Sequence, residues 1–104
     1  MGNQQDIDRF TLAFHVRAIA RLRENGKLVG QARDTLDRWR AQRGNTASDP
    51  YFDQWRALLD AGPDAVERSV CASTDAAATL RSVSPLGFVL SPQERQVLRR
   101  LAKA

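Results

Sequence analysis

The stretch Leu80–Arg95, which reads LRSVSPLGFVLSPQER, is the most distinctive part of the chain. The helical spacing of apolar residues that is found elsewhere stops there. Pro85 lacks a backbone N–H and keeps the residue before it out of the helical region, while Gly87 allows backbone angles that other residues avoid. Apolar side chains nevertheless crowd around these positions: Val83, Leu86, Phe88, Val89 and Leu90. Large apolar patches are rare on protein surfaces, so we expect this connector to lie against a hydrophobic core. A partner-docking surface is the alternative interpretation.

A helix is predicted to begin directly after this connector. Ser91-Pro92-Gln93-Glu94 is a capping box, in which the serine and glutamate side chains satisfy backbone N–H groups of the first turn. The helix that follows has two faces. The apolar face comprises Val97, Leu98 and Leu101, and the basic face comprises Arg95, Arg99, Arg100 and Lys103.

The rest of the chain also reads as helices. Apolar residues at three- and four-residue steps, with stop signals such as Asn25-Gly26, predict helices over residues 6–24, 28–42, 50–61, 63–71 and 75–82. No segment shows the sustained alternation of a strand. We therefore predict an all-α fold, a compact single-domain bundle of five or six helices over residues 6–104, with two longer N-terminal helices as a hairpin followed by shorter ones. Residues 1–5 are polar and are expected to form a flexible N-terminus.

The first predicted helix carries two apolar stripes, whereas a surface helix needs only one. One stripe comprises Ile7, Phe10, Phe14, Ala18 and Leu22, and the other comprises Leu12, Val16 and Ile19. This pattern indicates either that neighbours cover the helix on two sides or that one stripe is an oligomer contact. His15 lies between the stripes, and we expect it at the edge of the buried face or on the surface.

Composition and charge limit the classes of protein to which the chain can belong. The chain has 104 residues, 42% of them hydrophobic and 27% charged, which is ordinary for one globular domain. Its formal charge of +4 is unevenly spread: residues 1–43 hold nine Lys/Arg against five Asp/Glu, residues 44–90 three against six, and residues 91–104 four against one. The basic ends suit a phosphate backbone, and they equally suit the acidic middle once the chain folds.

Neither a membrane protein nor a disulfide-stabilised protein is expected. No apolar run approaches the roughly 20 residues that span a bilayer, and charged residues stand near the start, where a signal peptide needs an apolar stretch. Cys71 is the only cysteine, so no intrachain disulfide is possible. We therefore expect a cytoplasmic protein.

The sequence lacks the residues that a catalytic or metal-binding site requires. His15 is the only histidine, and Cys71 has no second thiol for a zinc motif. The close pairs of carboxylates have no apolar surroundings that would raise a pKa, and the glycines show no phosphate-cradling spacing. We predict a protein that is not an enzyme and has no cofactor or metal.

Two binding hypotheses remain. In the first, which we favour, the chain binds another protein through apolar and aromatic side chains of the third helix and the connector: Tyr51, Trp55, Leu86 and Phe88. In the second, it binds nucleic acid through basic N- and C-terminal helices, using Arg33, Arg40, Arg95, Arg99 and Arg100. Clustering of these arginines on one face favours nucleic acid, and their dispersal favours a protein partner. Core packing and a solvated cationic face are the ordinary structural explanations of the two sets.

Two stretches together resemble a pattern of small uncharacterised bacterial helical proteins. Tyr51–Gly62 contains aromatic-x-x-x-Trp-x-x-Leu-Leu, and Leu80–Arg95 contains Leu-Arg-x-x-Ser-Pro followed by Leu-Ser-Pro-x-Glu-Arg. Such proteins resemble small partners in two-gene, toxin–antitoxin-like operons. The resemblance implies an antitoxin-like regulatory role and brings no catalytic residues. Phe88 departs from it, because the pattern has glycine there and Gly87 lies one place earlier.

Overall fold

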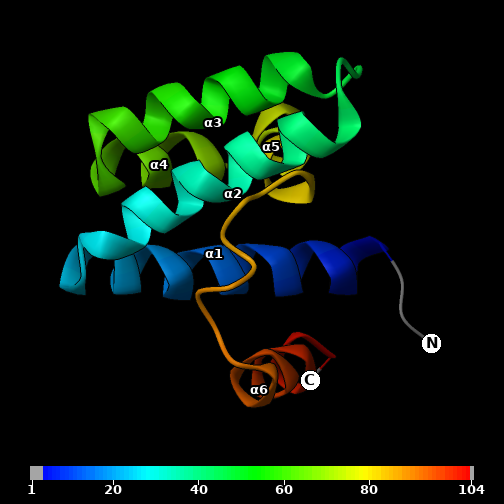
Figure 1. Cartoon of the computed structure of the whole chain (residues 1–104). Coiled ribbons are helices and arrows are strands. Elements are labelled where there is room, and N and C mark those ends of the chain that lie inside the picture. The colour runs from blue at the N-terminus through cyan, green and yellow to red at the C-terminus, as the bar shows by residue number, and fades with distance from the viewer. Residues whose placement is uncertain (1–3, 104) are drawn as a thin grey trace.

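Helix α1 (Gln4–Glu24) runs through the middle of the protein, with other helices on two opposite sides of it (Figure 1). The computed structural model describes residues 4–103. The remaining helices are, in order, α2 (Lys27–Arg43), α3 (Asp49–Ala61), α4 (Pro63–Val70), α5 (Asp75–Ser82) and α6 (Pro92–Lys103). Helices α2, α4 and α5 contact α1 from one side, α3 packs on α2 and α4, and α6 contacts α1 from the other side.

This arrangement confirms the predicted fold class. The described residues form six helices and no strand, and only Asn25 and Gly26 separate the two long N-terminal helices, so that α2 turns back across α1 (Figure 1). The radius of gyration is 13.5 Å, close to the roughly 13 Å of a compact domain of about 100 residues. Helix α1 begins at Gln4, so residues 4 and 5, which were predicted to belong to a flexible N-terminus, are helical. Residues 1–3 lie outside the described part of the chain.

The hydrophobic core forms where α1 faces α3, α4 and α5. Its large, almost fully buried side chains include Ile19, Leu22, Leu36, Leu59, Val66, Val70 and Leu80. Trp55 has no exposed surface, and its indole Nε1 donates a hydrogen bond of 2.8 Å to the carbonyl oxygen of Leu80. The ring is thus buried without leaving its polar N–H unsatisfied.

The apolar connector between α5 and α6 is buried against this core, as expected. Leu86 has no exposed surface, and Leu90 is also buried. The Ser84 hydroxyl accepts a hydrogen bond of 3.1 Å from the backbone N–H of Leu86, which provides that N–H with a partner beside Pro85. Phe88, by contrast, is 42% exposed. The connector is therefore structural along most of its length, and Phe88 is the exception.

Local signals placed the last helix correctly, and left-handed backbone occurs at glycines other than Gly26 and Gly87. The backbone N–H of Glu94 donates to Ser91 Oγ at 3.2 Å, and that of Ser91 donates to Glu94 Oε1 at 3.3 Å, which confirms the capping box. Gly26 has an ordinary right-handed φ of −62°, and Gly87 has no positive φ. Positive φ values occur instead at Gly44 (67°) and Gly62 (112°), which end α2 and α3.

His15 is buried, which corrects the expectation that it lies at an edge or on the surface. Only 3% of it is exposed, and its ring meets Phe14 edge-on with the centroids 5.3 Å apart. Its Nδ1 lies 2.6 Å from the carbonyl oxygen of Thr11, a group that only accepts, so Nδ1 carries the hydrogen. Burial lowers the pKa of His15 to about 4; the hydrogen bond to Thr11 opposes this shift and the charge of Arg81 adds to it. The expectation was wrong because neighbouring elements cover the sector between the two stripes of α1.

The pKa of His15 predicts a loss of stability in mild acid. Between about pH 6.5 and pH 4 the unfolded chain binds a proton at His15 that the folded chain does not, so stability falls as the pH falls through this range, by up to about 3 kcal/mol. The variant His15→Gln cannot take up that proton. Denaturant unfolding of both proteins at pH 7, 5.5 and 4 checks this prediction. The free energy of unfolding should fall more steeply with decreasing pH in the wild type than in the variant. The carboxyl groups contribute equally to both proteins, so a constant difference would contradict the assignment.

Two neighbours in the connector should differ in their effect on stability. Leu86→Ala opens a cavity in the core and should lower the free energy of unfolding by about 3 kcal/mol. Phe88→Ala removes a side chain that is already 42% exposed, so its cost should stay below about 1 kcal/mol. Urea unfolding monitored by circular dichroism measures both. Equal costs would mean that the connector is not pinned at Leu86.

Candidate protein-docking groove between α1 and α6

Apolar side chains line an open groove where α6 crosses α1. Val16 on α1 is 49% exposed, and Val97 and Leu101 on α6 are 53% and 65% exposed. Two hollows adjoin here, and they share Leu98 and Arg17. We call this surface the α1–α6 groove; its apolar residues are Leu12, Ala13, Val16, Val97, Leu98 and Leu101.

Helical spacing explains why these side chains remain exposed. On α6, Leu98 and Ala102 lie one turn apart and turn toward α1, where the carbonyl oxygen of Ala102 accepts a hydrogen bond of 3.4 Å from Arg9. Val97 and Leu101 are the same distance apart and lie on the adjoining face, so burying one pair leaves the other pair outside. The predicted apolar face of this helix is therefore only half covered.

Cationic side chains border the groove. Arg9, Ala13 and Arg17 follow one another at four-residue steps along α1, and both arginines are exposed. Among residues 4–103, Glu94 is the one acidic residue that lines the groove, and it forms a salt bridge with Arg21. A hydrogen bond from the backbone of Ser91, together with the charge of Arg21, lowers the pKa of Glu94. The groove therefore presents apolar surface between positive charges.

The structure separates the four residues predicted to bind a protein. Trp55 and Leu86 have no exposed surface, so both belong to the core and neither is available to a partner. Tyr51 and Phe88 are 38% and 42% exposed, one on α3 and the other on the connector. The available signal for the α1–α6 groove was the second stripe of α1, whose member Val16 remains uncovered.

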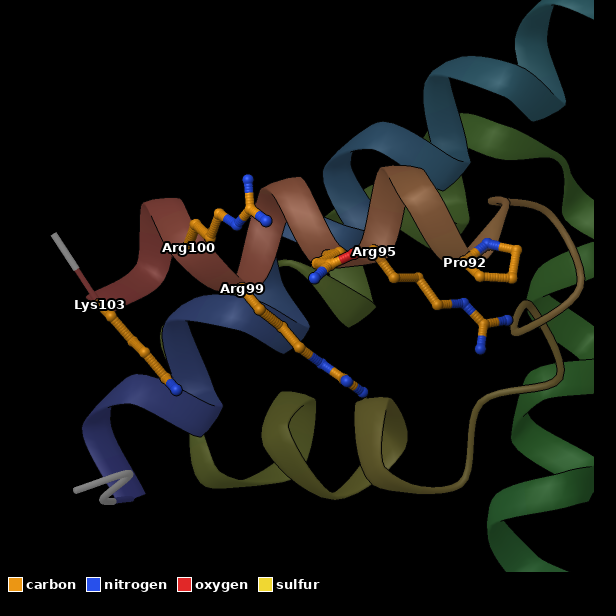
Figure 2. A pocket seen from close by; sticks show the side chains of 6 residues that line it. Pro92, Arg95, Arg99, Arg100 and Lys103 are labelled. Carbon is orange, nitrogen blue, oxygen red and sulfur yellow. The ribbon is translucent and has the colours of Figure 1, made fainter.

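The arginines predicted to bind nucleic acid are also dispersed. Arg33 and Arg40 on α2 form salt bridges with acidic residues of α3, Asp60 at 2.7 Å and Asp53 at 2.6 Å. Arg95, Arg99 and Arg100 lie on α6, across α1 from α2 (Figure 1). Even within α6, Arg100 leaves the helix on the side opposite to Arg95 and Arg99 (Figure 2). These five side chains do not form one cationic face.

The described residues contain no group of three His, Cys, Asp or Glu side chains that could hold a metal ion. Cys71 is partly buried, and desolvation, followed by the charge of Glu67, raises the pKa of its thiol.

None of the helices in residues 4–103 combines the length and hydrophobicity that a bilayer crossing requires. No protein-family model, curated protein or solved structure matches the chain.

Residues of the groove should be dispensable for folding. Leu101→Ser alters a side chain that is 65% exposed, so the free energy of unfolding should change by no more than about 0.5 kcal/mol. Leu22→Ala, on the buried face of α1, should lower it by about 3 kcal/mol. Denaturant unfolding checks both values. A large loss in Leu101→Ser would show that this face is covered in the folded chain.

Proposed function

We propose that this chain is a non-enzymatic regulatory protein that binds another protein through its α1–α6 groove. The occupant is an amphipathic helix of the partner, whose apolar face contacts Val16, Val97 and Leu101 and whose carboxylates pair with Arg9 and Arg17. The observation that carries the proposal is the half-covered apolar face of α6 beside the uncovered Val16. Helices commonly bind in apolar grooves of this kind through residues spaced one turn apart.

The charges around the groove indicate the charge of the partner helix. Arg9 and Arg17 border the groove, while its only lining carboxylate, that of Glu94, is already paired with Arg21. A helix with acidic flanks gains two ion pairs at the rim, whereas a basic helix meets like charges. The arrangement favours an acidic partner.

The antitoxin-like role implied by the resemblance remains a narrower proposal. The stretches that carry it, Tyr51–Gly62 and Leu80–Arg95, contribute mainly to the core, through Phe52, Trp55, Leu59, Leu80, Leu86 and Leu90. The pattern therefore relates to the fold more than to the groove. A regulatory partner in a two-gene bacterial operon is one protein-binding role compatible with the groove.

The proposal is tested by placing a photo-reactive amino acid at Val16 or at Leu101 of the full-length chain in cells that encode it. Both positions should cross-link to one partner, at an amphipathic helix rich in Asp and Glu. The same amino acid at Tyr51, an exposed position on α3, is the matched control and should not capture that helix. Arg17→Glu should reduce the cross-linking yield by about fivefold or more, because it places a like charge beside the partner's carboxylates.

Three outcomes would overturn the proposal. One is capture of a second copy of this chain alone, another is equal capture from Tyr51, and the third is no reduction by Arg17→Glu. Nucleic-acid binding, the alternative function, is tested separately with duplex and single-stranded oligonucleotides at about 50 mM salt, where binding that weakens steeply with salt would support it. Arg99→Gln and Arg100→Gln should leave the helix-binding signal unchanged and reduce only a nucleic-acid signal.

A further inference from the structure

A cavity of about 180 Å³ lies where α1, α5, the connector and α6 meet. Three guanidinium groups line it, Arg81 from α5 and Arg95 and Arg99 from α6, and none of the described residues in its lining is acidic. No salt bridge within residues 4–103 engages any of these three arginines. Cations gathered around one cavity without a counter-charge create a positive potential, which favours the binding of an anion.

The guanidinium groups are held in place by contacts that leave hydrogen-bond donors free. Arg99 lies 4.9 Å from the ring centroid of Phe10, and Arg95 lies 5.6 Å from that of Phe14. Arg81 donates at 2.7 Å to a backbone carbonyl at the end of α4. The Nε atoms of Arg81 and Arg95 are nevertheless buried without a hydrogen-bond partner among the described residues. Buried donors in native proteins normally have partners. The Nε atom of Arg40 on α2 lacks one too, but Arg81 and Arg95 bring two such donors to one cavity.

His15 contributes a third unpartnered atom, which is a hydrogen-bond acceptor rather than a donor. Its ring lines the cavity, it is 3% exposed, and its Nε2 has no hydrogen-bond partner in the described structure. Because Nδ1 carries the hydrogen toward Thr11, Nε2 presents a lone pair and accepts. The cavity thus combines several cationic donors with one neutral acceptor. A fully deprotonated oxyanion suits only the donors, whereas an oxyanion that still carries a hydrogen suits both.

We infer that this cavity binds a phosphate group that carries a hydrogen, with its oxygens on Arg81, Arg95 and Arg99 and its P–OH donating to Nε2 of His15. A volume of about 180 Å³ holds several times the roughly 30 Å³ share of one water molecule. It accommodates inorganic phosphate, which still carries a hydrogen at neutral pH. No covalent step is involved, and the site is separate from the α1–α6 groove.

The approach to the cavity is cationic as well. A larger hollow along α6 is lined by the cations Arg95, Arg99, Arg100 and Lys103, and it adjoins the cavity through Arg95 and Arg99, which line both. Figure 2 shows Arg95, Arg99 and Lys103 leaving α6 on one side and Arg100 on the other. A surface of one charge leading into a site attracts counter-ions to it. Arg100 lines this hollow but not the cavity, so Arg100→Gln removes a charge from the approach alone and serves as the control on the same helix.

The test is titration calorimetry of the full-length protein at pH 7.5 and constant ionic strength, with inorganic phosphate, glycerol phosphate and sulfate. Phosphate should bind about tenfold or more tightly than sulfate, which has no hydrogen to give Nε2. Arg95→Gln should weaken phosphate binding by about tenfold or more, because a charge-assisted contact is lost. Arg100→Gln should change it less than about twofold. Glycerol phosphate has mostly lost its hydrogen at pH 7.5, because the second pKa of a phosphomonoester is about 6, so it should bind weakly, as sulfate does.

A second measurement keeps the inference testable if a variant folds poorly. His15 is the only histidine in the chain, so its ring resonances report on this cavity in the wild-type protein without a variant. Inorganic phosphate should shift those resonances and raise the pKa of His15, since a bound anion stabilises the imidazolium form. Equal affinity for phosphate and sulfate, equal effects of Arg95→Gln and Arg100→Gln, or unmoved His15 resonances would each overturn the inference. Leu101→Ser, a groove variant, should bind phosphate as the wild type does.

Discussion

The hydrogen bond from the indole N–H of Trp55 to the carbonyl oxygen of Leu80 is the contact on which the rest of the structure depends. It joins the centre of α3 to the last turn of α5 inside the core, where both residues are almost fully buried. The same carbonyl accepts a second bond from the N–H of Val83 as the helix ends. Because a buried indole N–H requires an acceptor, the end of α5 is fixed in position, and the connector starts from that point.

The path of the connector then determines both surfaces that carry our proposals. It leads from α5, on one side of α1, to α6 on the other side (Figure 1), with Leu86 and Leu90 buried along the way. Between α5 and α6 this path leaves the cavity lined by His15 and three arginines. Beyond α6 it leaves the second stripe of α1 only partly covered, which creates the α1–α6 groove. One chain path thus produces both a cavity with three arginines in its lining and an apolar groove.

The arginines divide into two groups with different surroundings. Three of the eight in α1 and α2 pair with the acidic middle of the chain: Arg23 with Asp64 at 2.8 Å, Arg33 with Asp60 at 2.7 Å and Arg40 with Asp53 at 2.6 Å. Such exposed pairs add little stability, but they occupy charges that would otherwise be available to a polyanion. Those of α6 lie over aromatic rings or face solvent. The positive charge that remains unpaired around the cavity is therefore local, and it suits a small anion.

The sequence by itself determined the helices and their ends, because caps, prolines and the spacing of apolar residues act over a few neighbouring positions. The all-α class and the capping box at Ser91 could both be predicted in this way. Which sector of each helix is covered depends on where its neighbours lie, and only the tertiary structure decided that. For this reason His15 proved buried, Val97 and Leu101 proved exposed, and the arginines proved dispersed. Neither the groove nor the cavity belongs to one segment, because each forms only where distant parts of the chain meet.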